Sequence, residues 1–317
     1  MKRRNFLGQI GALGLTASTI SILQACGNNQ NTEETATSTP IFNEFGLQLW
    51  TIKEDLALDS LATLKAVADA GFNYVESFGG DKGIFWGYEA KEFGKILTDL
   101  GLKIKASHCS PEYTTDISTE EEFKKLAADA ASIGLKYLIN PFPGELKTKD
   151  EWMKVAEGLN RQGEICKANG IRTAYHNHHI EFLPCESGEL PENILIENTD
   201  PSLVDFEMDM YWVIKAGQDP VEWLKKHNSR FKLCHVKDLL PNAKLEEIEN
   251  NETPEGDFWP LGGSCNLGQG QIDFKKLLPL AKENGMEYFI AEQERFDTMP
   301  PIQAIVEDAK YMKSFTV

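Results

Sequence analysis

Residues 98–108 read TDLGLKIKASH: the end of an amphipathic helix, a glycine, and a short β-rich run. A glycine in this position takes the left-handed conformation that ends a helix, and the run after it fits a buried parallel strand. The same pattern occurs five times, at 68–77, 98–108, 131–140, 167–176 and 282–292. This repeat predicts parallel strands that alternate with helices.

Three further runs complete a set of eight strands, at 45–50 (FGLQLW), 202–209 (SLVDFEMD) and 230–238 (RFKLCHVKD). A helix begins between the last two with Asp219 and Pro220, a cap residue followed by proline. Eight strands and eight helices over about 270 residues have the size of a (β/α)8 barrel. An open doubly wound sheet is disfavoured because no glycine-rich turn follows the first strand. The sequence therefore predicts an α/β fold, a single (β/α)8 TIM barrel domain over 45–317.

The first 44 residues differ from the rest of the chain. A basic start, MKRRN, is followed by a modest apolar stretch and by the tetrad Leu23-Gln24-Ala25-Cys26. The arginine pair resembles a twin-arginine export signal and the tetrad resembles a lipobox, which makes Cys26 the expected lipidation site. We expect residues 1–26 to be the export signal and 27–44 a polar tether. The expected location is that of an exported bacterial lipoprotein, periplasmic or attached to the cell envelope, whose membrane contact is its lipid anchor only.

The bulk composition narrows the class of partner. Of 317 residues, 41% are hydrophobic and 26% charged, which is typical of a globular protein with an ample core. The net charge of −17 argues against nucleic acid as a partner, because phosphate binding needs a basic surface. The five cysteines after Cys26 show no CxxC spacing, so they do not indicate a disulfide framework.

Polar side chains stand at the C-terminal ends of the predicted strands, where the catalytic residues of such barrels lie. In chain order they are Gln48, Glu76, His108, Asn140, His176, His178, Asp209, His235, Lys237, Asp238, Glu292 and Glu294. Buried ionisable groups are costly unless they are paired or bind a metal. Any one of them could simply bond to a neighbouring loop, but a set that spans four consecutive strand ends favours a metal site.

Three of the six histidines of the chain lie in 174–182, AYHNHHIEF. On a strand His176 and His178 share a face, so the spacing does not decide which of them binds a metal. In the strand 202–209, Asp209 lies nearest the mouth of the barrel, while Asp205 and Glu207 lie deeper or pair with lysine. Imidazole and carboxylate ligands together suit Mn²⁺, Fe²⁺, Co²⁺ or Zn²⁺.

Several motifs resemble the xylose-isomerase-like superfamily of sugar phosphate isomerases and epimerases, which also contains inosose dehydratase. They are GLQLWTIKEDL (46–56), AYHNHHIEF (174–182), FEMDMYWVIKAGQDP (206–220), CHVKD (234–238), LGQGQIDF (267–274) and AEQE (291–294). The resemblance implies one divalent metal ion (Mn, Zn, Co, Fe or Mg), held by His176, Asp209, His235 and Glu292. His176 stands where a glutamate is frequent in epimerases, which argues against epimerisation by two matched glutamates. The YHNH variant is more similar to the inosose dehydratase branch.

The resemblance implies a metal-dependent sugar isomerase or epimerase that removes a proton next to a carbonyl and forms an enediolate. The catalytic residues it implies are Glu292, Glu294 or His178 as the base, and Lys237 as partner of a substrate oxygen or a charge. We expect substrate contacts from Gln48, Glu76, His108 and Trp212. Two alternatives stay open, a lyase or hydratase acting on a keto-sugar or keto-glycoside, and a carbohydrate-binding lipoprotein without activity. The expected partner is a small carbohydrate without phosphate, and the oligomeric state stays open.

Overall fold

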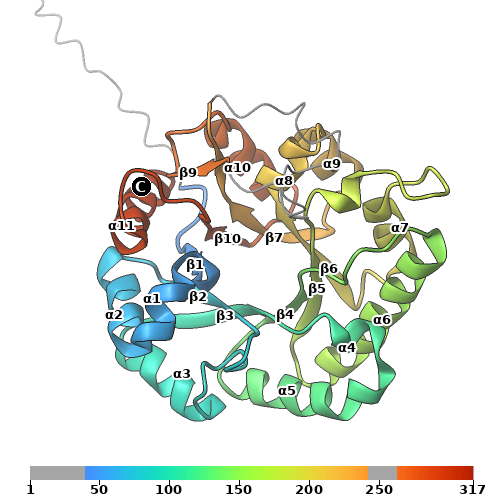
Figure 1. Cartoon of the computed structure of the whole chain (residues 1–317), viewed down its shortest axis with the longest axis horizontal. Helices are drawn as coiled ribbons and strands as arrows, with labels where there is room; N and C mark the ends of the chain where they lie inside the picture. Colours follow the sequence, from blue (N-terminus) through green and yellow to red (C-terminus); the bar gives the residue numbers. More distant parts are fainter. Residues whose placement is uncertain (1–39, 242–262, 317) are drawn as a thin grey trace, which may run out of the picture. The chain divides into compact units, whose positions relative to one another are not determined.

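The computed structural model describes residues 40–241 and 263–316, and in this part of the chain eight parallel strands close into one barrel. The strands are β1 (Gly46–Gln48), β2 (Tyr74–Phe78), β3 (Lys103–His108), β4 (Tyr137–Asn140), β5 (Arg172–His176), β6 (Val204–Asp209), β7 (Phe231–Val236) and β10 (Tyr288–Ala291). Their order around the barrel is β1-β10-β7-β6-β5-β4-β3-β2, and helices surround them (Figure 1). The predicted TIM barrel is confirmed.

The helices follow the predicted alternation, with several short additions. The helices are α1 (Lys53–Leu58), α2 (Ser60–Ala70), α3 (Ala90–Asp99), α4 (Glu112–Thr115), α5 (Glu120–Ser132), α6 (Lys149–Ala168), α7 (Pro191–Asn198), α8 (Met210–Lys215), α9 (Pro220–Lys226), α10 (Phe274–Glu283) and α11 (Pro301–Lys313). All five repeat glycines have positive φ, between 74° at Gly170 and 99° at Gly71. This confirms that glycine ends these helices because it tolerates the left-handed conformation.

The first strand is shorter than predicted. Residues Leu49–Ile52 form a 3-10 turn, η1, directly after β1. The side chain of Gln48 accepts a hydrogen bond from the backbone N–H of Trp50 at 3.0 Å and so caps this turn. The sequence pattern predicts strand through Trp50, but the local cap competes with strand extension.

The packed part of the domain begins before the predicted boundary at residue 45. Phe42 is 4% exposed and stacks on Phe289 with ring centroids 4.7 Å apart. The N–H of Ile41 donates to the carbonyl of Phe315 at 2.9 Å. Residues 41–44 are therefore packed as part of the domain rather than as tether. The predicted export signal, Cys26 and the rest of the tether lie outside the described residues.

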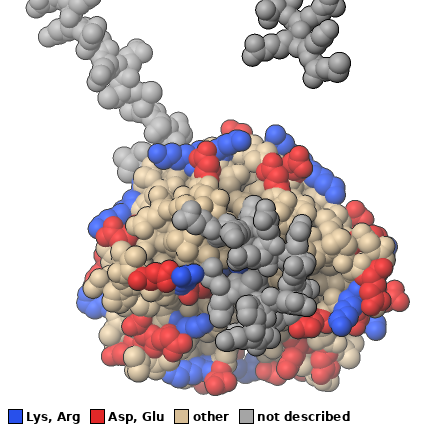
Figure 2. All heavy atoms as spheres, turned by 45° about the horizontal axis from the view of Figure 1, so that its top comes forward, with Lys and Arg blue, Asp and Glu red and all other residues tan. Residues whose placement is uncertain are grey.

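The interior of the barrel has an apolar floor below a polar mouth. Tyr74, Ala106, Tyr137, Ile139, Ala174, Leu233 and Ile290 form the floor. Strand register aligns the polar positions above it, since Gln48 pairs with Glu76, His176 with Glu207, and Asp209 with His235. On the face shown in Figure 2, acidic and basic side chains are interspersed. No helix within 40–241 or 263–316 has the length and apolar character needed to cross a membrane.

Asp238 fastens the segment before α10 to the end of β7. Its carboxylate accepts hydrogen bonds from the backbone N–H groups of Leu239, Gly268, Gly270 and Ile272, at 2.8 to 3.2 Å. The neighbouring strands β8 (Asp238–Leu239) and β9 (Ser264–Cys265) pair antiparallel. One buried carboxylate thus holds residues 268–272 against the end of β7.

This anchor predicts a strict requirement for glycine at 270. A Cβ at Gly270 would lie 2.1 Å from Oδ1 of Asp238 and 2.4 Å from the carbonyl oxygen of Leu239, so Gly270→Ala must displace the anchored loop. We expect a loss of about 1–3 kcal/mol in the free energy of unfolding, measured by urea denaturation. Gly80→Ala is the matched control, because its nearest atom would lie 4.0 Å away. Equal stabilities of the two variants would contradict the anchor.

Candidate active site

A cavity of about 920 Å³ opens at the C-terminal ends of the strands. Its described ionisable lining consists of Lys53, His108, Cys109, His176, His178, Tyr211, Lys237, Glu292, Glu294 and Arg295. Its aromatic lining also includes Trp50, Phe78, Phe142 and Trp212. This is the end of the barrel where catalytic residues are expected, and the volume is typical of a small-molecule site.

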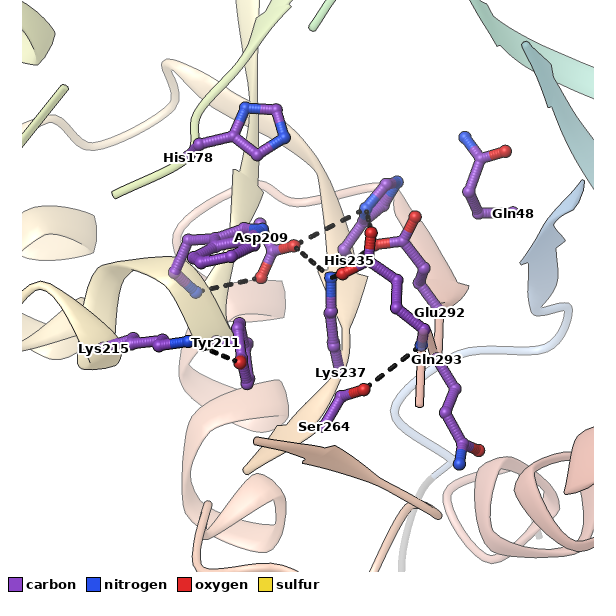
Figure 3. A network of polar contacts seen from close by, with 12 residues as sticks. Gln48, His178, Asp209, Tyr211, Lys215, His235, Lys237, Ser264, Glu292 and Gln293 are labelled. Carbon is purple, nitrogen blue, oxygen red and sulfur yellow. Dashed lines mark hydrogen bonds and ion pairs between the residues drawn. The ribbon is translucent and has the colours of Figure 1, made fainter. Parts of the chain in front are cut away.

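Three of the four predicted metal ligands form the outer cluster, which we define as Asp209, His235 and Glu292. Nδ1 of His235 lies 3.2 Å from Oε2 of Glu292 and 3.8 Å from Oδ2 of Asp209. The three ligand atoms lie within 4.8 Å of one another, and all three residues are buried. Figure 3 shows these side chains turned toward one another at the ends of β6, β7 and β10.

The fourth predicted ligand, His176, belongs to a second group. We define the inner cluster as His108, His176 and Glu207, beside the other nitrogen of His235. Oε2 of Glu207 lies 3.0 Å from Nε2 of His108, 3.1 Å from Nδ1 of His176 and 3.4 Å from Nε2 of His235. His235 stands between the two clusters and faces each with a different ring nitrogen.

Gln48 and Glu76 do not line the cavity, although both were predicted to contact substrate. Both side chains are fully buried. Oε1 of Glu76 accepts hydrogen bonds from Nε2 of Gln48 at 2.6 Å and lies 2.7 Å from Nε2 of His235. Strand register turns these two side chains toward the histidines, and their contact with substrate stays a prediction. Of the predicted substrate contacts, His108 and Trp212 line the cavity.

Lys237 lies beside the outer cluster. Its Nζ is 3.2 Å from Oε2 of Glu292 and 4.0 Å from Oδ2 of Asp209, and it forms an ion pair with Glu294. Burial disfavours the ammonium charge, but the carboxylates of Glu292, Glu294 and Asp209 raise the pKa of Lys237 above its ordinary value. Lys237 is therefore a permanent positive charge at the cavity wall.

The buried carboxylate of Glu181 holds the loop after β5 that carries His178. It accepts hydrogen bonds from the hydroxyl group of Tyr175 at 2.5 Å and from the backbone N–H of His178 at 2.7 Å. Burial, above all, lowers the pKa of His178 well below its ordinary value, and the charge of Lys237 adds to the effect. His178 is thus held as a neutral imidazole beside the cavity.

The electrostatics of His235 test whether the outer cluster fits a metal ion. A neutral imidazole carries one N–H, yet both ring nitrogens of His235 face carboxylates. Although burial opposes the charge, the carboxylates of Glu207, Glu292 and Glu76 raise the pKa of His235 well above its ordinary value. If Nε2–H donates to Glu76, the lone pair of Nδ1 faces Asp209 and Glu292, and this arrangement needs a proton or a cation.

The surroundings of Asp209 also indicate a cation at the outer cluster. Burial, chiefly, raises its pKa to about 7, and the negative charge of Glu292 contributes. Its Oδ2 is buried and accepts no hydrogen bond from the described residues. Two carboxylates and one imidazole around an unsatisfied oxygen fit a divalent cation such as Mn²⁺ or Zn²⁺.

Two residues of this site were hardly indicated by the sequence pattern. Glu207 lies deep, as one of its two predicted alternatives had it, but its partners are histidines rather than lysine; its alternation with Asp209 was the available signal. Asp205, the other deep acid, forms an ion pair with Arg172. Glu181 carried no signal beyond its place three residues after His178, because its role depends on burial.

Comparisons with known proteins agree with this architecture. Residues 64–315 match the family model described as "Xylose isomerase-like TIM barrel". The chain belongs to this family. The resemblance predicted from the motifs is confirmed, and it places the protein in an enzyme superfamily.

Relatives within the family differ in their described reactions. An inosose dehydratase of Clostridium perfringens is 30% identical over 183 residues, which are 57% of this chain and 58% of that protein, less than two thirds of its length. An inosose dehydratase of Clostridium botulinum is 26% identical over 244 residues, covering 71% and 80% of the two chains. The solved structure of a sugar phosphate isomerase/epimerase from Parabacteroides distasonis has 29% identity and a TM-score of 0.70, covering 85% and 97%.

The Glu181 contact predicts a pH-dependent stability. Burial raises the pKa of Glu181 to about 7 in the folded protein, so the folded state favours its neutral form. Its contribution to stability is complete below the unfolded pKa of about 4.3 and is lost as the pH rises to about 7, at up to about 1.4 kcal/mol per pH unit. In Glu181→Gln this loss disappears, so the free energy of unfolding, measured by urea denaturation between pH 4.5 and 7.5, falls less steeply than in wild type. The exposed Glu186→Gln serves as control and should follow the wild-type profile; parallel profiles for all three would contradict the assignment.

Proposed function

We propose that the protein is a carbohydrate lyase that removes a proton next to the carbonyl of a keto-sugar and eliminates a hydroxyl group as water, or catalyses the reverse hydration. The observation that carries this proposal is the division of the cavity wall. Lys237, Glu292 and Glu294 line it from the ends of β7 and β10, while His108, His176 and His178 line it from β3 and β5. In the strand order of the barrel, β3 stands opposite β7, which supports a binding mode in which the sugar contacts both sets.

The β7–β10 side suits the carbonyl oxygen. The ammonium group of Lys237 is positioned to stabilise negative charge that develops on that oxygen when the neighbouring C–H proton leaves. Asp209, His235 and Glu292 are the residues that would hold a divalent cation, which supplies Lewis-acid polarisation of a carbonyl group.

His178 is the preferred base among the three predicted residues. Glu292 is paired with His235 and Lys237, and Glu294 is paired with Lys237. His178 is a neutral imidazole at the cavity, so it can accept the C–H proton. Its imidazolium can then return that proton to the hydroxyl oxygen on the adjacent carbon as the C–O bond breaks, and the balance is one keto-sugar converted to its dehydrated product and one water.

Epimerisation by matched carboxylates on opposite faces of the sugar is less well supported. Among the described lining residues the only carboxylates are Glu292 and Glu294, and both follow one strand, β10. Isomerase or epimerase activity remains the second candidate, because the Parabacteroides distasonis protein of that description covers most of the chain. Both reactions begin with the same proton removal.

The proposed substrate is a free keto-sugar or keto-glycoside. Trp212 and Phe142 provide apolar surface for a sugar ring at the cavity wall. A substrate without phosphate also agrees with the proposed export of the protein as a lipoprotein anchored through Cys26. Folded export would deliver the barrel with its metal already bound.

The proposal predicts that His178→Gln loses proton removal but keeps the fold. We expect the exchange of solvent deuterium into substrate C–H and the release of water from keto-sugars to fall at least about 100-fold, because acid–base catalysis contributes about 10²- to 10⁴-fold. NMR of a panel of sugars and keto-sugars in D2O measures both. His227→Gln is the control, since His227 caps α9 away from the cavity lining.

The same experiment separates the candidate functions. Deuterium exchange with interconverted sugars and no dehydration would replace the lyase by an isomerase or epimerase. Sugar binding without exchange in the wild type would leave a carbohydrate-binding protein. Full activity in His178→Gln would show that another residue is the base.

A further inference from the structure

The inner cluster has the dimensions of a metal site of its own. Glu207 places Oε2 at 3.0 Å from Nε2 of His108 and 3.1 Å from Nδ1 of His176. Ligands bound to Zn²⁺ at about 2.0–2.2 Å in a tetrahedron stand about 3.4 Å apart, so small outward shifts would admit an ion. Nδ1 of His176 makes no hydrogen bond with the described residues, and neither does Oε1 of Glu207.

The buried charges of the barrel mouth indicate more than one cation. Glu76, Glu207, Asp209 and Glu292 are all buried, and Lys237 pairs with Glu292 at 3.2 Å as well as with the exposed Glu294. A single divalent cation balances two of the four buried carboxylates. Because uncompensated buried charge is very costly, the other two need protons, on the histidines or on the carboxylates themselves, or a second divalent cation.

We propose that His108, His176 and Glu207 bind a second divalent cation, separate from the ion assigned to the outer cluster. His235 lies at both sites, but we assign it to the outer ion alone, because Nδ1 faces the outer cluster while Nε2 is held by Glu76 at 2.7 Å. Two histidines and one carboxylate form a common three-ligand set for Zn²⁺, Mn²⁺ and Fe²⁺ that leaves coordination positions open.

The open positions of this second site face the cavity. His108 and His176 both belong to the cavity lining, and the side chain of His108 is 12% exposed. The inner ion would therefore reach a substrate oxygen on the β3–β5 side, across from Lys237. The second ion deepens the proposed function, because each side of the sugar then has its own charged contact. For the nature of the substrate, this inference rests on the proposed function.

Metal stoichiometry of the full chain tests the proposal without an activity assay. Metal-free protein is loaded with Zn²⁺ or Mn²⁺, dialysed, and analysed by mass spectrometry of the metal, with affinities from calorimetry. We expect two equivalents in wild type and one in Glu207→Gln, His108→Gln and Asp209→Asn. Glu192→Gln and His227→Gln keep two equivalents, because both residues lie outside the two clusters. Thermal unfolding of each variant checks that the fold is kept, and the partly exposed His108 is the safeguard if Glu207→Gln does not fold.

The outcomes distinguish this proposal from the proposed function. One equivalent in wild type that is lost in Asp209→Asn and kept in His108→Gln would overturn the second site and leave the outer ion in place. One equivalent that is lost in His108→Gln and kept in Asp209→Asn would support the inner site and remove the outer ion from the proposed mechanism. Two equivalents that persist in both Glu207→Gln and His108→Gln would place the second ion elsewhere and overturn the proposal.

Discussion

The imidazole of His235, buried with a carboxylate at each ring nitrogen, is the constraint on which the mouth of this barrel depends. Glu76 lies on one side, and Glu292 with Asp209 lies on the other. No neutral imidazole can donate in both directions, so one side needs a second proton, on the ring or on the facing carboxylate, or a cation. With Glu207, four carboxylates lie within 3.8 Å of the nitrogens of this ring.

The barrel supplies this arrangement because its strand ends converge. Parallel register sets Asp209 beside His235 and His176 beside Glu207, while His108 reaches His235 from the opposite wall with ring centroids 5.4 Å apart. Such a concentration of buried carboxylates costs stability unless it is compensated. Burial of apolar side chains in the floor and between helices and strands offsets that loss of stability. At the mouth, function rather than packing decides which residues are present.

The fold was predictable from local chemistry. A glycine that ends a helix, followed by a β-rich run, specifies the repeat unit, and five such units together with three further strands leave little choice of closed architecture. The places where the prediction failed are also instructive. At Gln48 a side-chain cap ended β1 early, and at Phe42 an apolar residue in a polar stretch packed onto the core. Both depend on contacts that the hydrophobic pattern does not record.

The sequence by itself determined which chemical groups stand at the strand ends, because alternation along a strand fixes the face of each side chain. It could therefore identify Asp209, His235, Glu292, Lys237 and the histidines of 174–182 as a site. Only the tertiary structure decided how these groups associate. His176 joined His108 and Glu207 rather than Asp209, and Gln48 and Glu76 turned beneath the cavity. The physical reason is that cross-barrel distances and burial depend on the stagger of all eight strands at once, and no local stretch of sequence contains that information.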